Sequence, residues 1–442
     1  MTYLRNVSIT GFKAVEELEF QPNNLTLITG RNNSGKTSVL EAIDLLFNPS
    51  KIKQYDDLVG KLVNAKSEKA VLSCEYQKGT QLSLRDFDGD GNVARTKTRA
   101  LEIKKPEPDR VTEIFISSVL DIVENSPDSR YFVDRFAGQT LDIEDESNVL
   151  GEIIIDTIKD LVTSNSESVA RKAEESCIIL TVDGVEYEYI YLGEFYSNYT
   201  ESVAKKGANR IRNQIVESDK LPEQNIEEAR LLSAIKDVLI PRFGKGRFVG
   251  DEPTSIDGIQ HIGQSLSLDP ENIDMNKEEA AVRLSNIEEY IKNNNIVKNL
   301  DTLSFDQLVF ESRGDKYQVP FSFMGSGFHA IMGLLWALSN TRNSGNVLLI
   351  EEGENHLHPG YIAEFVHRIL KIIMDENVQI FLTTHSLDLI RTIFNEDIFQ
   401  EEHKYLLENF CLLQMNPPVT ESYSYQEAQR QLNELRLDLR GL

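Results

Sequence analysis

The sequence is poor in features that would place it among secreted, metal-stapled or membrane proteins. It holds only three cysteines, Cys74, Cys177 and Cys411, and their wide spacing predicts buried free thiols rather than disulfides or a zinc site. No run of about 18 or more apolar residues occurs, so we expect no transmembrane helix and no membrane partner. The opening residues lack the apolar core of a signal peptide, so we expect a cytoplasmic protein.

Positive charge is also scarce, since 46 basic residues face 71 acidic ones and the net charge is −25. This balance excludes a surface that is basic overall and wraps nucleic acid, although a local basic groove stays open. Basic residues gather at Arg95, Lys97, Arg99, Lys104 and Lys105, and again at Lys205, Lys206, Arg210 and Arg212. We favour solvated faces balanced by nearby acids, and contact with DNA phosphates is the alternative.

Both ends of the chain have the texture of an α/β protein. Alternating apolar residues predict a strand or hairpin over 4–20, and an apolar strand over 25–30 precedes an amphipathic helix that includes 39–47. Near the other end, the patterns predict a strand at 346–350, a helix at 361–374, a strand at 378–383 and a tail helix at about 424–436.

The region between these ends has a different pattern. We expect strands at 71–76, 81–84 and 111–117, then a mainly helical stretch from about 145 to 300. One hairpin, 178–182 with 187–191, interrupts it at the turn pair Asp183-Gly184. The sequence therefore predicts a domain assembled from 1–145 and 301–442, with a mainly helical insertion at 146–300.

The strongest motif is a glycine-rich loop between the strand at 25–30 and the following helix. Gly30-Arg-Asn-Asn-Ser-Gly-Lys-Thr37 matches the phosphate-loop pattern G-x-x-x-x-G-K-[ST] in full. Backbone N–H groups and the helix N-terminus attract an anion, while Lys36 reaches the β- and γ-phosphates and Thr37 binds Mg²⁺. The residues expected to bind ATP are Gly30, Arg31, Asn32, Asn33, Ser34, Gly35, Lys36, Thr37 and Ser38.

A phosphate-loop enzyme needs a second acidic site at the end of another buried strand. The strand at 346–350 is followed by Glu351, which we expect on the Mg²⁺ side, and Glu352, which we expect to activate the attacking water. A competing triplet, Asp251-Glu252-Pro253, follows a segment too short and polar for a central strand, so we interpret it as a loop.

Two weaker motifs follow in chain order. Gly325-Ser326-Gly327 precedes an apolar helix, whose N-terminus can cradle an anion. His385 follows the strand at 378–383, where a histidine can contact a γ-phosphate, although a lone histidine is more often structural. The order of the four motifs carries more information than either weak motif alone.

That order resembles the ABC-type ATPases of the SMC, RecF and OLD (overcoming lysogenization defect) group. The opening strand 6–13, the loop and helix 30–43, and the stretch Glu351-Glu-Gly-Glu-Asn-His-Leu-His-Pro359 are all similar to that group, most of all to OLD-like ATPases of prokaryotic defence. The resemblance covers about 1–50 and 320–390 well. It implies an α/β fold, an ABC-type ATPase head with a mixed sheet and flanking helices.

The resemblance also implies a mechanism and partners. ATP and Mg²⁺ are the expected cofactors, bound between the heads of a homodimer or higher homo-oligomer. Each site would combine the phosphate loop of one subunit with Ser326 of the other, and His385 would be the switch histidine. Two positions depart from the pattern, because Glu351 stands for the usual aspartate and Gly353 for the usual proline.

The resemblance leaves the biological role open between alternatives. Only 57 residues follow His385, too few for a Toprim nuclease domain, so we expect a separate effector protein, a nuclease or toxin, controlled by this ATPase in anti-phage defence. A RecF-like ATPase that clamps DNA and a non-hydrolysing ATP-bound scaffold are the alternatives. The resemblance also implies a Q-loop glutamine, expected at the strand end near Ser117-Ser118, but the sequence has no glutamine there.

The segment 86–97 begins like a calcium-binding loop. We interpret it as a polar hairpin turn.

Overall fold

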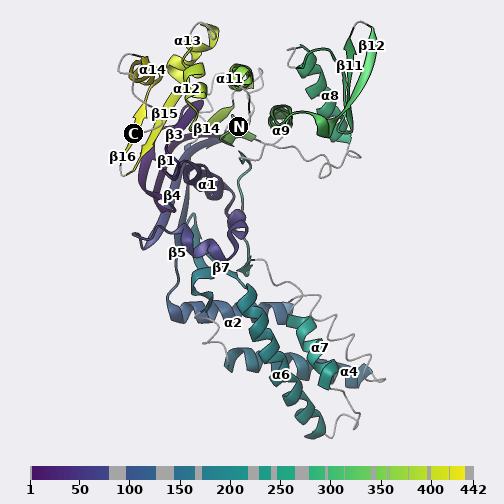
Figure 1. Ribbon diagram of the computed structural model, residues 1–442. Helices are drawn as coiled ribbons and strands as arrows, with labels where there is room; N and C mark the ends of the chain where they lie inside the picture. The colour runs from purple at the N-terminus through teal and green to yellow at the C-terminus, as the bar shows by residue number, and fades with distance from the viewer. Residues whose placement is uncertain are drawn as a thin grey trace, which may run out of the picture.

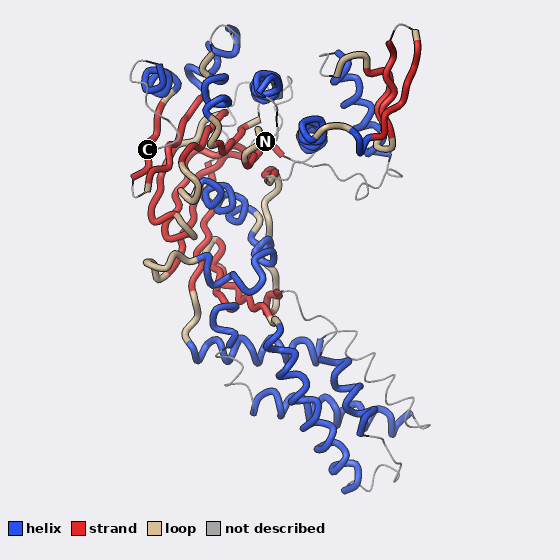
Figure 2. The backbone as a smooth tube through the Cα atoms, viewed as in Figure 1, coloured by secondary structure: helices blue, strands red, loops and turns tan. Residues whose placement is uncertain are grey.

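The structure is a computed structural model that describes most of the chain. The residues outside its description are 1, 79–95, 126–143, 165–171, 218–227, 240–245, 264–277, 294–296, 313, 340–344, 356, 358, 377, 396–399, 418 and 434–442. The predicted strand at 81–84, Arg95 and most of the calcium-loop-like segment lie among these. The described residues form three β-sheets with helices around them (Figures 1 and 2).

The largest sheet is antiparallel throughout, with the order β2-β1-β4-β5-β6-β7-β8. Its strands are β1 (Thr2–Phe12), β2 (Val15–Phe20), β4 (Lys69–Lys78), β5 (Thr96–Lys104), β6 (Cys177–Val182), β7 (Val185–Tyr191) and β8 (Gly246–Val249). The segment 4–20, predicted as a strand or a hairpin, is the hairpin β1–β2, and the hairpin predicted at 178–182 and 187–191 is confirmed as β6–β7. The second turns through Asp183 and Gly184, whose φ angles of 50° and 87° suit a two-residue hairpin.

The second sheet has the order β16-β15-β3-β14-β13-β9 and is parallel except at the β15–β16 edge. Its strands are β3 (Leu25–Gly30), β9 (Gly258–Ile262), β13 (Gly345–Glu351), β14 (Gln379–Thr384), β15 (Phe410–Asn416) and β16 (Val419–Tyr423). β3 and β14 are buried along their whole length, which explains their continuous apolar runs.

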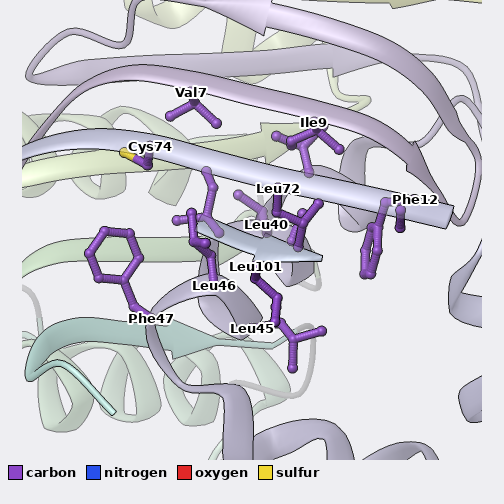
Figure 3. Close-up of a cluster of buried hydrophobic side chains, with 14 of the residues drawn as sticks. Val7, Ile9, Phe12, Leu40, Leu45, Leu46, Phe47, Leu72, Cys74 and Leu101 are labelled. Atoms are coloured by element: carbon purple, nitrogen blue, oxygen red, sulfur yellow. The ribbon is translucent and has the colours of Figure 1, made fainter. Parts of the chain in front are cut away.

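Helix α1 (Lys36–Phe47) lies between the two sheets and joins their cores. Its buried side chains share one hydrophobic cluster with β1, β4 and β5 on one side and β3, β13 and β14 on the other. Figure 3 shows part of this cluster, where Leu40, Leu45, Leu46 and Phe47 of α1 gather with Val7, Leu72 and Leu101 of the antiparallel sheet. The irregular 3₁₀ segment η1 (Pro49–Leu62) follows.

Four helices pack on the opposite face of the parallel sheet. They are α11 (Pro359–Glu376), α12 (Leu387–Ile393), α13 (Gln400–Asn409) and α14 (Tyr425–Asn433). Their apolar side chains form a separate cluster with β3, β13, β14 and β15. The predicted helices at 361–374 and in the tail are thereby confirmed, the latter to its last described residue.

A helical lobe extends from the edge of the antiparallel sheet (Figure 1). It contains α2 (Pro108–Asn125), α4 (Glu144–Ser164), α6 (Glu194–Glu217) and α7 (Glu228–Leu239), which share one core. The strand predicted at 111–117 is wrong, because this segment is the start of α2. Val111, Ile114, Phe115, Val119 and Ile122 are buried at helical spacing, so helix packing overrides their β propensity.

A smaller lobe combines a three-stranded antiparallel sheet with two helices. Its elements are β10 (Leu300–Leu303), β11 (Gln307–Ser312), β12 (Asp315–Pro320), α8 (Glu278–Asn293) and α9 (Ser326–Ser339). The apolar helix predicted after Gly327 is confirmed as α9, whereas this sheet was not predicted from the sequence. Among the described helices of the chain, none is both long and apolar enough to cross a membrane.

The predicted domain limits at 145 and 300 do not follow this packing. Residue 145 lies inside α4, and residue 300 begins β10. Strands from the predicted insertion complete both large sheets, since β6, β7 and β8 belong to the antiparallel sheet and β9 is the edge of the parallel one. A role of the helical lobe in dimerisation or partner binding stays a prediction.

A buried glutamine connects the two large sheets at the start of β14. Gln379 is fully buried, and its Oε1 accepts a hydrogen bond from the Leu4 backbone N–H at 2.8 Å. Its Nε2 donates to the Leu4 carbonyl at 3.0 Å and to the Asn23 carbonyl at 3.3 Å. Strand β2 pairs with β1 only from Val7 onward, so this side chain takes the place of a strand partner for Leu4.

Gln379→Leu keeps the volume of this side chain and removes all three hydrogen bonds. We expect it to lower the free energy of unfolding by about 2–5 kcal/mol, because buried backbone groups of Leu4 lose their partner. Chemical denaturation followed by circular dichroism measures the change. Gln307→Leu, at an exposed position in β11, is the control, and equal stability of the two variants contradicts the prediction.

Candidate active site

The phosphate loop lies where the sequence predicts it, between the end of β3 and the start of α1. Gly30 has a φ of 150°, and a Cβ there would lie 2.5 Å from Ser34 Oγ and 2.6 Å from the Met415 carbonyl oxygen. Gly35 has a φ of 97° and is the N-cap of α1. Both positions therefore require glycine for the loop to close over the helix N-terminus.

Lys36 is buried at the base of this loop, with only 6% of its surface exposed. Its Nζ donates to the carbonyl oxygens of Gly30 and Arg31, each at 2.9 Å. Burial lowers the pKa of Lys36, while the charges of Glu352, Glu354 and Glu351 act in the opposite direction. The Lys36 ammonium group lies in the loop at the N-terminus of α1, where it can meet an anionic ligand together with the loop N–H groups.

The two side chains predicted to hold a metal meet in the fold, although they are 314 residues apart in the sequence. The hydroxyl of Thr37 at the start of α1 donates to Glu351 Oε1 at the end of β13. A hydroxyl and a carboxylate are the oxygen donors that Mg²⁺ takes from proteins when phosphate oxygens and water complete its shell. These residues therefore fit the predicted ion.

Glu352 and His385 also lie in contact, at the ends of neighbouring strands. Glu352 Oε1 lies 3.1 Å from His385 Nδ1, and Glu352 Oε2 accepts a hydrogen bond from Asn355 Nδ2 at 2.8 Å. The backbone of Glu352 has a φ of 45°, a region that non-glycine residues rarely adopt. Its N–H donates to the carbonyl and to the hydroxyl oxygen of Thr383, both at 3.1 Å, which holds this conformation.

Strand register explains why these residues converge. Thr383 of β14 is paired with Ile28 of β3 on one side and with Glu351 of β13 on the other. Because all three strands run parallel, their carboxyl ends meet at one edge of the sheet. The phosphate loop, the two acids and the histidine each follow one of these strand ends.

The converging side chains line one cavity of about 440 Å³. Its walls are Ala14, Asn32, Asn33, Ser34, Gly35, Lys36, Thr37, Ser38, Glu352 and His385. Of the expected ATP-binding residues in the loop, Gly30 and Arg31 are not among these lining residues, and their carbonyl oxygens accept hydrogen bonds from Lys36. Ala14 comes from the turn between β1 and β2 and was missed, because nothing in its residue type signals a role.

Ser326 lies elsewhere in the chain. It is the first residue of α9, in the smaller lobe with β10, β11 and β12. One cation–π contact joins this lobe to the parallel sheet's outer helices, with the Arg368 guanidinium of α11 4.4 Å from the ring centre of Tyr290 in α8. The predicted role of Ser326 at the site of a second copy stays a prediction.

The glycine that replaces the usual proline has a packing reason. A Cβ on Gly353 would lie 2.8 Å from Phe365 Cζ and 2.9 Å from Ile350 Cγ2. Helix α11 thus packs directly against the backbone of the loop that follows Glu352. The ring of a proline would not fit without displacing Phe365.

Other described residues considered in the sequence as candidates for the site do not line the cavity. Asp251 and Glu252 follow the edge strand β8, and Glu252 pairs with Lys53 at the surface, as expected for a loop. Ser117 and Ser118 lie in α2, so the predicted strand end is wrong. The strand that pairs with β13 on the side away from β14 is β9. The chain continues from β9 through Gly263 to Gln264, and Gln264 lies outside the described part of the chain.

The basic clusters are largely paired with acids. Arg99 is buried and binds the carbonyls of Leu46 and Thr254 as well as Asp183, so it is structural. The remaining described pairs are Lys104–Glu186, Lys105–Glu175, Lys205–Glu201 and Arg210–Asp160. These contacts agree with the interpretation of the clusters as balanced, solvated faces.

The match to a protein family spans most of the chain, whereas the matches to single known proteins span less of it. Residues 3–390 match the AAA ATPase domain family. An ATP/GTP phosphatase from Helicobacter pylori is 28% identical over 127 residues, which make up 27% of this chain and 34% of that protein. The DNA replication and repair protein RecF from Chlorobium luteolum is 32% identical over 153 residues, 31% of this chain and 38% of RecF. The chain thus matches little more than a third of the length of either relative.

Among solved structures, the Smc head domain from Pyrococcus furiosus, bound to the C-terminal domain of ScpA, aligns over 99% of this chain and all of that one. Its TM-score is 0.41 and its identity 13%. The recombination mediator RecF with ATPrS aligns over 95% of this chain and 98% of its own, with a TM-score of 0.32 and 12% identity. Scores this low carry no argument about function.

The family match includes the phosphate loop, the acidic end of β13 and the histidine after β14. These are the segments that build the cavity described above. The protein belongs to the AAA ATPase domain family.

Proposed function

We propose that the protein binds ATP with Mg²⁺ in this cavity and hydrolyses it to ADP and phosphate. The observation that carries the proposal is the convergence of Lys36, Thr37, Glu352 and His385 on one cavity, with Glu351 at the hydroxyl of Thr37. Lys36 and the loop N–H groups would bind the β- and γ-phosphates. Bound Mg²⁺ would neutralise charge on the same phosphates, held by Thr37 and Glu351.

Glu352 is the proposed general base. Both of its carboxylate oxygens have a partner, His385 on one side and Asn355 on the other, so the group is held in one orientation at the cavity wall. Water attacks the γ-phosphorus while Glu352 accepts its proton, and the bond to the β-phosphate oxygen breaks as ADP leaves. His385 would contact the γ-phosphate from the same side.

Two substitutions test binding and chemistry separately. Lys36→Ala should weaken ATP binding by about tenfold or more, because a charged donor to the phosphates is lost. Glu352→Gln should keep ATP binding and lower kcat by about 10²–10⁴-fold, because an amide cannot accept the proton. Isothermal titration calorimetry and phosphate release are the measurements.

Lys53→Ala and Glu252→Gln are the matched controls, since this exposed pair lies outside the cavity and should leave both quantities unchanged. Unchanged ATP binding in Lys36→Ala would sink the assignment of the site. ATP binding without any turnover in the wild-type protein would favour the alternative of a non-hydrolysing scaffold. The reason to consider this alternative is that Glu351 replaces the usual aspartate.

We further propose that two copies pair head to tail, with Ser326 of one copy completing the site of the other. The position of Ser326 at the N-terminus of α9, in the smaller lobe, supports this arrangement. A helix N-terminus that approaches from a second subunit would add partial positive charge at the γ-phosphate. A two-fold axis would then make both sites equivalent.

Mixing two inactive variants tests the shared site. Lys36→Ala and Ser326→Arg should each abolish turnover alone. An equimolar mixture that exchanges subunits should recover about a quarter of the wild-type rate, because half of the dimers are mixed and each holds one intact site. Phosphate release by the mixture is the measurement, and a mixture as inactive as its components contradicts the arrangement.

For the biological role, we propose a sensor or scaffold in anti-phage defence that controls a separate effector. The OLD-like stretch from Glu351 to Pro359 supports this role. The second candidate is a RecF-like ATPase that clamps DNA, and the 32% identity to RecF over 153 residues favours it. We place the first ahead because the net charge is −25 and the described basic clusters pair with acids.

DNA binding separates these two roles. For the defence role, we expect duplex DNA affinity at moderate salt to be unchanged by ATP, measured by fluorescence anisotropy. For the RecF-like role, binding would require ATP, fall steeply with salt, and weaken when Lys104 and Lys105 are both changed to alanine. Tight ATP-dependent binding with that salt dependence would move the second candidate to first place.

A further inference from the structure

A buried carboxyl group that lies just behind the cavity has no part in the chemistry described so far. Glu354 follows β13 in the loop after Glu352 and is only 5% exposed. Its Oε1 accepts a hydrogen bond from the hydroxyl of Thr384, the last residue of β14. Its Oε2 is buried and has no hydrogen-bond partner among the described residues.

Thr384 passes this contact on to the residues around His385. The Thr384 side chain is fully buried, and its Oγ1 also accepts a hydrogen bond from the Ser386 N–H at 2.9 Å. The hydroxyl thus donates to Glu354 and accepts from Ser386, so it fixes the backbone on both sides of His385. The ring of His385 is half-exposed. Among the described residues, its polar contact is Glu352, whose Oε1 lies 3.1 Å from His385 Nδ1.

Glu354 is not among the described residues that line the cavity, and its side chain is buried. Asn355 also contacts Glu352, but both residues lie in the same loop. Asn355 donates its Nδ2 to Glu352 Oε2 and its backbone N–H to the Glu352 carbonyl at 2.9 Å. The Glu354–Thr384 bond instead crosses from the end of β13 to the end of β14.

A carboxyl group at this position is costly for the fold. Burial raises the pKa of Glu354, while the hydrogen bond from Thr384 and the charge of His385 act against this rise. A buried oxygen without a partner gives up its hydrogen bonds to water and gains none in return, and an apolar side chain of similar size would avoid that loss. Simple packing therefore does not explain a glutamate here.

We propose that Glu354 is a positioning residue, which holds His385 against Glu352 through the hydroxyl of Thr384. The inference rests on the proposed ATPase function, since it assigns Glu354 to the same site. The loop after β13 carries the general base and also the carboxyl that fixes the strand end opposite it. Base and histidine are thereby positioned by one four-residue segment, Glu351–Glu354.

The test compares variants that keep or remove the acceptor and the hydroxyl. Glu354→Gln keeps an acceptor at Oε1 and should retain kcat within about threefold of wild type. Glu354→Leu and Thr384→Val break the contact and should lower kcat by about 10- to 100-fold, because a small displacement of a catalytic group is costly. KM for ATP should change by no more than about twofold, since the phosphate loop is untouched.

A spectroscopic measurement separates positioning from a general loss of structure. Long-range ¹H–¹⁵N spectra of histidine-labelled protein report the state of each imidazole nitrogen, and His385→Gln identifies the His385 signal among the seven histidines. We expect the Nδ1 signal of His385 to move in Glu354→Leu and Thr384→Val and to stay in Glu354→Gln. Thr26→Val removes another buried strand hydroxyl, in β3, and should change neither kcat nor this signal.

The outcomes distinguish this inference from the function on which it rests. If the wild-type protein has no turnover, the proposed function fails, while the histidine spectra still test the Glu354 contact. Wild-type kcat in Glu354→Leu and Thr384→Val overturns the inference. So does a lowered kcat with an unchanged His385 signal, or a Glu354→Gln variant as impaired as Glu354→Leu.

Discussion

The hydrogen-bond ladder that joins β3, β14 and β13 is the constraint on which the rest of the site depends. Thr383 sits in the middle of it, paired with Ile28 and with Glu351 in the two neighbouring strands. Because side chains alternate along a strand, a slip of one residue in either pairing would turn Glu351 to the other face. The distances among Lys36, Glu352 and His385 follow from this register and from the loops that it anchors.

Helix α1 transmits that constraint to the second large sheet. Its apolar side chains pack against β1, β4 and β5, while its first two residues, Lys36 and Thr37, end the phosphate loop. Gln379 adds a polar contact between the sheets by completing the hydrogen bonds of Leu4. The antiparallel sheet therefore supports the position of the phosphate loop without lining the cavity, except through Ala14 in the β1–β2 turn.

The sequence was sufficient to predict the elements with strong local patterns. The apolar runs of β3, β13 and β14 and the glycine loop specify their conformation through residues adjacent in the chain. Prediction failed where the local structure depends on contacts with residues far away in the sequence. The segment from Val111 is helical because it packs in the helical lobe, and the short, polar β9 exists because β13 offers it a parallel partner. The roles inferred for Asn355 and Glu354 depend on contacts that only the fold creates.

The separation of the site's parts along the chain has a consequence for synthesis in the cell. Most strands of the antiparallel sheet pair with close sequence neighbours, so this sheet can form early as the chain leaves the ribosome. The parallel sheet needs β13, β14 and β15, which emerge after all strands of the antiparallel sheet, and contacts of such long range form slowly. A nucleotide that binds only the closed sheet would stabilise the finished protein and none of its earlier intermediates. Cellular ATP would then act as a late checkpoint on folding, independently of any turnover.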